Sequence, residues 1–245
     1  MMRVGVYVDG FNLYYGGRKQ LDKVPGWRWL DIGALATDLV QARREWPGAS
    51  VERVVYCTAQ IDQGFNPAGH AEQYAYLQAL RAAGSVDHIE FGRYVTGVRA
   101  RPLAVRADTK RGAPRLVTPE WPIMIQAPLG HETQDAVFMV STLHQEEKGS
   151  DVNVATHLLT DVLTADVDAA VVISNDSDLK LPIARARGHV PVGMVNPSGG
   201  NTAGDLRGKP TDGVGGHWWR SLRAPDFTTH QLPDAVGTIT KPPQW

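Results

Sequence analysis

Four aspartates that lie far apart in the chain stand where elements of secondary structure are expected to begin or end. Carboxylates that are brought together repel one another and raise each other's pKa unless a cation compensates. Hard oxygen ligands favour Mg²⁺ or Mn²⁺, and two such ions can activate water and stabilise the leaving oxygen of a phosphodiester. The residue types therefore predict a metal site for hydrolysis, with the candidate ligands Asp9, Asp151, Asp176 and Asp178.

Each aspartate also has an ordinary structural interpretation. Asp9 precedes Gly10 and could serve a turn. Asp176 or Asp178 could cap a helix, and Asp151 could favour a helix start through the macrodipole. The coincidence of all four at such positions favours a shared site over these separate roles.

Two apolar runs must position these carboxylates. Residues Val4 to Val8 and Ala169 to Ile173 are apolar throughout, as expected of central parallel strands that are buried on both faces. Asp9 follows the first run, and Asp176 and Asp178 follow the second. In an open α/β sheet the carboxyl ends of the strands line the ligand crevice, above all where the strand order reverses. If the two strands are neighbours at that point, the three carboxylates converge.

The rest of the chain alternates strand and helix patterns, which predicts a doubly wound, mostly parallel sheet flanked by helices. Asp31 is expected to cap a helix, and Gly84 and Gly188 are expected to follow helix ends. Helices are predicted at residues 31–44, 71–83, 151–164 and up to 187, and strands at residues 51–58, 88–95 and 190–195.

Residues 99–146 are predicted to be a basic insertion. Its prolines argue against long helices, and residues 116–117 and 123–125 could form short strands. Tyr94 could stack on a base, and the clustered cations suit a phosphate backbone, although a solvated loop explains them nearly as well. The cations that we take as candidate substrate contacts are Arg99, Arg101, Lys110 and Arg111.

Residues 201–245 are expected to form a glycine-rich loop and an extended C-terminal arm. The arm would pack on the domain or offer a surface to a partner protein or to a second copy of the chain. The main α/β domain itself would span residues 1–200.

Bulk properties exclude several classes of protein. A net charge of -1 and a pI near 6.7 exclude a uniformly cationic nucleic-acid binder. The single cysteine, Cys57, excludes an internal disulfide. The first apolar run is too short for a signal peptide, and no segment approaches the roughly 20 apolar residues that span a bilayer. We therefore expect a cytoplasmic protein without a membrane partner.

Other motifs are absent or weak. The eight histidines form no His-x-x-x-His pair, so His70, His144 and His157 are expected to be ordinary residues. No Gly-x-Gly-x-x-Gly follows the first strand and no Walker A motif exists, which argues against dinucleotide and P-loop sites.

Three stretches of the chain resemble the NYN family, a branch of the PIN-like nucleases that includes the LabA-like bacterial proteins. Their order and separation follow the family pattern, and the resemblance extends more loosely from Arg3 to about Pro197. Asn175 stands where many relatives have glycine, and Leu179 where phenylalanine is common, which predicts altered loop geometry. The matching stretches are Tyr7 to Tyr14, Glu147 to Val152 and Ile173 to Leu179.

This resemblance implies a Rossmann-like PIN fold and a divalent-metal-dependent ribonuclease, with RNA as partner and Mg²⁺ or Mn²⁺ as cofactor. It implies that Asp9, Asp151, Asp176 and Asp178 correspond to the family's metal-binding acidic cluster. It also implies that Asn12 orients the substrate or a metal-bound water. Ser174 would support the site by hydrogen bonding. Lys148 could touch a phosphate, although a solvated lysine is the more common role.

Two other functions compete with the ribonuclease. A non-catalytic RNA-binding or regulatory module is one, but the complete set of four aspartates argues against it. A DNA-directed nuclease of the PIN-like type is the other, because phosphodiester chemistry does not itself choose between sugars.

Overall fold

The computed structural model of the chain describes residues 1–22, 24–107, 109, 112–119, 136–243 and 245. It divides into two compact units. Unit 1 comprises residues 1–94 and 147–245, and unit 2 comprises residues 95–146.

Unit 1 is a mixed α/β structure around the central part of a seven-stranded sheet with the order β6-β3-β2-β1-β7-β8-β9. From β3 to β9 in this order, all neighbouring strands pair in parallel. The strands are β1 (Met2–Asp9), β2 (Ala49–Ala59), β3 (His88–Pro102), β6 (Met139–Lys148), β7 (Ala169–Ile173), β8 (Val192–Asn196) and β9 (Trp218–Ser221).

The strand order reverses at β1. The chain runs outward from β1 through β2 to β3, then returns to place β7 on the other side of β1. Asp9 ends β1 and Ser174 follows β7, so the predicted neighbourhood of these two strands is confirmed. The arrangement is compatible with a Rossmann-like fold, and its crevice is expected at the carboxyl ends of β1 and β7.

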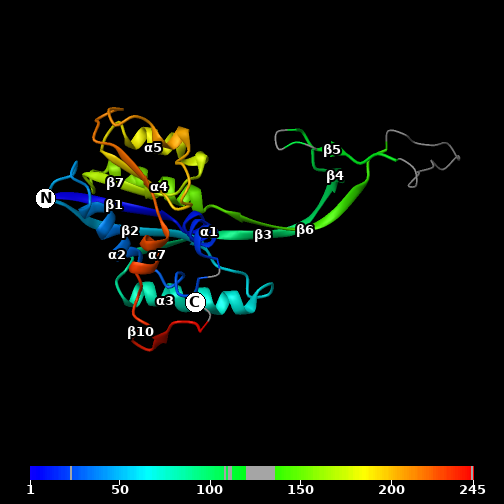
Figure 1. The fold of residues 1–245 in the computed structure, drawn as a ribbon, viewed down its shortest axis with the longest axis horizontal. Helices are drawn as coiled ribbons and strands as arrows, with labels where there is room; N and C mark the ends of the chain where they lie inside the picture. The colour runs from blue at the N-terminus through cyan, green and yellow to red at the C-terminus, as the bar shows by residue number, and fades with distance from the viewer. Residues whose placement is uncertain (23, 108, 110–111, 120–135, 244) are drawn as a thin grey trace. The chain divides into compact units, whose positions relative to one another are not determined.

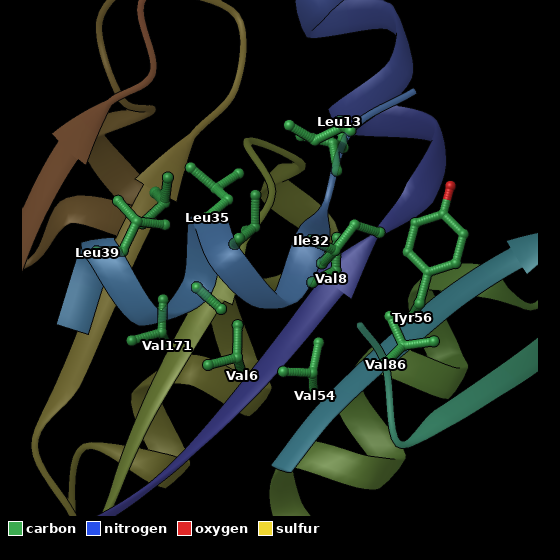
Figure 2. Packing of buried hydrophobic residues seen from close by; sticks show 14 of the residues in the cluster. Val6, Val8, Leu13, Ile32, Leu35, Leu39, Val54, Tyr56, Val86 and Val171 are labelled. Atoms are coloured by element: carbon green, nitrogen blue, oxygen red, sulfur yellow. The ribbon is translucent and has the colours of Figure 1, made fainter. Parts of the chain in front are cut away.

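Helices cover both faces of the sheet in unit 1 (Figure 1). Figure 2 shows the packing of one face, where Val6 and Val8 of β1 lie near Leu35 of α2. On the other face Tyr7 and Val55 pack with residues of α4 and α5. The helical segments are α1 (Gly10–Leu21), α2 (Ile32–Gln41), α3 (Pro67–Ala82), α4 (Ser150–Leu163), η1 (Ser177–Leu179), α5 (Lys180–Ala186), α6 (Gly204–Arg207) and α7 (Ala224–Thr229).

Most predicted elements are confirmed within a few residues. Asp31 caps α2 by accepting a hydrogen bond from the backbone of Ala34. The predicted strand at residues 88–95 continues as far as Pro102. In place of the turn expected after β1, α1 begins at once at Gly10. A Cβ on Gly10 would lie 2.8 Å from the ring of Tyr56 and 2.9 Å from the carbonyl oxygen of Cys57, so glycine lets α1 approach β2.

Unit 2 is built on the outer parts of β3 and β6. Arg99 pairs with Glu146 at 3.3 Å, and Thr142 donates a hydrogen bond to the carbonyl of Arg99. The small strands β4 (Ala104–Val105) and β5 (Arg115–Leu116) pair antiparallel, where a short strand was predicted at residues 116–117. The strand predicted at residues 123–125 lies outside the described residues.

The C-terminal segment is more than the extended arm predicted for it. Its strand β9 pairs in parallel with β8 and completes the sheet, and β10 (Ala235–Val236) and β11 (Ile239–Thr240) form a small ladder. The last residue, Trp245, packs against Trp29 and Tyr76 and donates a hydrogen bond to Glu72. Among the helices of the described residues, none combines the length and apolar character needed to cross a membrane.

Candidate functional site

Asp9 lies at the carboxyl end of β1, where the strand order reverses, and only 3% of its surface is exposed to solvent. Its carboxylate accepts a hydrogen bond from the backbone amide of Asn12 at 3.0 Å and one from the Asn12 side chain at 2.8 Å. The hydroxyl of Ser174 donates a third bond at 2.9 Å. The buried carboxylate is therefore held from both α1 and the end of β7.

A hydrogen-bond network continues from Asp9 into the loop that follows β7. The side-chain oxygen of Asn12 accepts a bond from the amide of Asn175 at 3.2 Å, and the hydroxyl of Ser174 accepts one from the amide of Asp176 at 3.1 Å. The side-chain oxygen of Asn175 in turn accepts a bond from the amide of Ala203. Asn12 and Ser174 thus fix the position of Asp9.

Burial raises the pKa of Asp9, and the nearby charge of Asp176 acts in the same direction. The hydrogen bonds from Asn12 and Ser174 oppose this rise because they stabilise the ionised form. A buried carboxyl with a raised pKa at a sheet edge is suited to proton transfer.

The other three aspartates of the predicted cluster occupy different positions. Asp176 caps η1 and accepts a hydrogen bond from the amide of Asp178 at 3.0 Å, and Asp178 is exposed. Asp151 lies in the first turn of α4. Among the described residues, no three of these four carboxylates bring their oxygens within 4.8 Å of one another. The role of these four aspartates as one site stays a prediction.

The predicted substrate-binding cations also fall in separate places. Arg99 and Arg101 belong to unit 2, where Arg99 pairs with Glu146 and Arg101 lies 3.4 Å from the Nδ1 atom of His144. Lys148 is exposed at the end of β6. The other two candidates, Lys110 and Arg111, lie outside the described residues.

One cluster of side chains was missed by the sequence analysis. His88 and Glu90 on β3 meet His157 on α4, a residue that was expected to be ordinary. The Nε2 atoms of His88 and His157 lie 2.9 Å and 3.2 Å from the same oxygen, Oε2, of Glu90. A signal for half of this cluster was present, because His-x-Glu within a strand places both side chains on one face.

Asp9 and the cluster of His88, Glu90 and His157 are linked through neighbouring register positions of the sheet. Asp9 pairs in register with Cys57, and Cys57 pairs with Glu90. Burial raises the pKa of the Cys57 thiol to about 12, and the charges of Asp9 and Glu90 contribute. Cys57 is therefore a neutral thiol between two carboxylates. Since neighbouring strands are about 4.8 Å apart, the backbones of Asp9 and Glu90 are about 10 Å apart.

Comparison with known proteins gives one informative relative. The 6-hydroxy-3-succinoylpyridine 3-monooxygenase HspA of Pseudomonas putida is 30% identical over 265 residues, which cover 100% of this chain and 75% of that protein. A protein of unknown function from Vibrio parahaemolyticus is 15% identical, covers 90% of this chain and 93% of its own, and has a TM-score of 0.44, too low to establish a shared fold. No protein-family model matches the chain.

The relative corrects the functional prediction. The prediction of a ribonuclease is wrong, together with its RNA-module and DNA-nuclease alternatives, because a protein aligned with the whole chain is an oxygenase and not a hydrolase. The assignment of Mg²⁺ or Mn²⁺ as hydrolytic cofactor is wrong for the same reason. The expectation of an enzyme agrees with the relative. The resemblance to the NYN family, the PIN-specific fold and an RNA partner stay predictions. By its alignment, the chain belongs to the family of the 6-hydroxy-3-succinoylpyridine 3-monooxygenase HspA.

Proposed function

We propose that this protein is a monooxygenase that acts on a hydroxylated pyridine carrying an acyl chain with a carboxylate. The observation that carries the proposal is the 30% identity to the Pseudomonas putida enzyme over the entire chain. The ring would meet Phe11, two residues after Asp9, and Tyr94, which pack edge to face with 6.1 Å between ring centroids. Aromatic rings favour such contacts with one another.

A monooxygenase transfers one atom of dioxygen to its substrate and releases the other as water. The balance requires two electrons and two protons for each turnover. The electrons come from an external two-electron reductant, such as a reduced nicotinamide. The protons must pass through groups at the site, and this is the step in which the chain's own side chains act.

Asp9 is the residue that we assign to proton transfer. Its carboxylate must be ionised to take up a proton and pass it on, and burial, which raises its pKa, makes it a stronger base than an exposed aspartate. Its place at the reversal of strand order is where an α/β sheet binds ligands. Asn12 and Ser174 are positioning residues, since both contact Asp9 directly.

Oxygenases often hold a dinucleotide, and the residues after β1 do not fit one. In a dinucleotide site a glycine-rich turn brings the pyrophosphate to the N-terminus of the first helix. Here the chain runs from Asp9 directly into α1, and the Asp9 carboxylate already accepts the amide of Asn12. A second anion at this place would meet the buried charge of Asp9. We therefore derive no step from a dinucleotide bound at this turn.

Isotope labelling tests the proposed function. Tag-free protein supplied with Fe(II) and reduced nicotinamide is incubated with 6-hydroxy-3-succinoylpyridine under ¹⁸O₂, and the products are analysed by mass spectrometry. We expect a product that carries one ¹⁸O atom from dioxygen and none from labelled water. The analogue without the ring hydroxyl serves as control and is expected to react more slowly. Oxygen derived from water, or no product at all, would contradict a monooxygenase.

Replacing Ser174 with alanine is expected to change the pH dependence of the reaction. The Ser174 hydroxyl lowers the pKa of Asp9 by donating to its ionised form, so its removal raises that pKa further. The acidic limb of the pH–rate profile then moves to higher pH, while the plateau rate changes little. Ser177→Ala, at an exposed position next to Asp176, is the matched control. An acidic limb that stays in place for Ser174→Ala would show that Asp9 does not set it.

A further inference from the structure

The cluster of His88, Glu90 and His157 has the composition of a metal site. It offers two imidazole nitrogens and one carboxylate oxygen, all within 4.8 Å of one another. Two of these ligands come from β3 and the third from α4, so a strand and the helix packed over the sheet hold them in place. A set of two histidines and one carboxylate with open positions is the ligand set of non-haem Fe(II) oxygenases.

The distances between the ligand atoms fit one shared ion. First-row divalent ions hold imidazole nitrogen and carboxylate oxygen at about 2.0–2.2 Å, so two ligands at a right angle are about 3 Å apart. The measured separations from Glu90 Oε2 are 2.9 Å to His88 Nε2 and 3.2 Å to His157 Nε2. Both separations therefore match adjacent positions on one coordination sphere.

The surroundings of the cluster leave room for further ligands. The side chains of His88 and Glu90 are 43% and 39% exposed, and that of His157 is 20% exposed. Three protein ligands on one side would thus leave coordination positions open to water or a small molecule.

The cluster lies on the same face of the sheet as Asp9. Glu90 is two strands from Asp9 in register, with Cys57 between them. Val55, which pairs with His88, and Cys57 both pack in the core beneath α4, the helix that carries His157. An ion here would lie at the same edge as the residue assigned to proton transfer.

We propose that His88, Glu90 and His157 bind one divalent first-row transition-metal ion, and that this ion is Fe(II). The binding of an ion follows from the geometry alone, whereas its identity as iron rests on the proposed monooxygenase function. An iron ion held by these three residues would supply the redox chemistry that dioxygen requires. An iron ion would also account for the activation of dioxygen without a dinucleotide, which the residues after β1 do not fit.

Metal binding without turnover tests the proposal. Tag-free protein is freed of metal with a chelator and titrated with Fe(II), Co(II) or Zn(II) in the absence of dioxygen, by calorimetry and, for Co(II), by visible absorption. We expect one Fe(II) or Co(II) ion per chain. Because loss of an outer-shell partner alone costs about 10–100-fold in affinity, loss of a ligand in Glu90→Gln or His157→Ala is expected to cost at least about 100-fold.

Matched variants separate the site from general effects on the protein. His189→Ala removes an exposed histidine on another segment and is expected to bind the ion as wild type does. Glu90→Gln keeps the size of the side chain, and circular dichroism verifies its fold. A wild-type chain that binds no ion, or a Glu90→Gln variant that binds with wild-type affinity, would overturn the metal site. Binding of Zn(II) alone would overturn the assignment of iron.

The labelling experiment then distinguishes failure of the site from failure of the function. If wild type incorporates ¹⁸O and Glu90→Gln does so at the same rate, the part of this ion in the reaction and its assignment as iron are overturned, and the monooxygenase stands. If the ion binds through the three residues but no ¹⁸O enters any product, the function and the assignment of iron are overturned, while the site stands as a binder of another divalent ion.

Discussion

Replacing Asp9 with asparagine is expected to lower the turnover of the monooxygenase reaction by about 10²- to 10⁴-fold, the range that general acid–base groups contribute. Asparagine has nearly the same shape but cannot take up or release a proton. Turnover is measured as ¹⁸O-labelled product over the full pH range. The acidic limb of the profile should disappear together with the rate.

Asp9→Asn needs a second measurement because its side-chain NH₂ group would face the hydrogen-bond donors of Asn12 and Ser174, which could destabilise the fold. Asp9 accepts three hydrogen bonds, two from Asn12 and one from Ser174, and an NH₂ group there would leave about 1–3 kcal/mol of unmet hydrogen bonding. Asp9→Glu keeps the charge but displaces it, and should retain more activity than Asp9→Asn. Asp22→Asn, at the other end of α1, is the control. A folded Asp9→Asn variant with wild-type turnover would remove Asp9 from the chemistry.

The raised pKa of Asp9 also predicts how stability changes with pH. The folded state binds the Asp9 proton more tightly than the unfolded chain, whose aspartates have a pKa near 3.9. The contribution to stability is therefore complete below the unfolded pKa and falls as the pH rises through the folded pKa. Asp9→Asn should show a weaker loss of stability over this range in urea titrations at several pH values.

The central strands could be predicted because their sequence reflects burial on both faces. The runs that form β1 and β7 are apolar throughout, and the carboxyl-terminal position of Asp9 follows from them. Helix α1 could not be predicted in the same way, since Gly10, Gly16 and Gly17 have low helix propensity. Their presence reflects close packing: added Cβ atoms on Gly16 and Gly17 would meet Pro197 and Trp27, residues brought near only by the fold.

The candidate site shows a similar division. The sequence located Asp9 and Ser174 because both stand next to strand ends that are recognisable locally. Glu90 and His157 are 67 residues apart, and they meet only because α4 packs over β3 and β2. The four aspartates show the limit of such a pattern, since their order along the chain does not reveal that Asp178 is exposed in the turn after β7. A one-dimensional pattern cannot report such side-chain directions.

Replacing Asp161 with alanine is expected to lower the free energy of unfolding by about 3–5 kcal/mol, a large part of the stability of a typical domain. Asp161 lies on α4 and is buried, and its two oxygens serve different partners. One accepts the hydroxyl of buried Tyr7 at 2.9 Å, and the other pairs with Arg53 at 2.8 Å. Alanine would leave a buried hydroxyl and a guanidinium without their acceptor, together with a cavity.

Two further variants identify the origin of that loss in urea unfolding curves. Tyr7→Phe removes one hydrogen bond while Arg53 still holds Asp161, so the expected loss is about 0.5–1.5 kcal/mol. Asp168→Ala breaks a pair with Arg3 in which both side chains are more than 40% exposed, and its loss should be much smaller than that of Asp161→Ala. If Asp161→Ala were no more harmful than Asp168→Ala at an unchanged urea dependence, the buried contacts would not stabilise the layer between α4 and the sheet. A large loss for Asp161→Ala with a much smaller one for Asp168→Ala would instead show that this carboxylate helps to hold α4, which also carries His157, against β1 and β2.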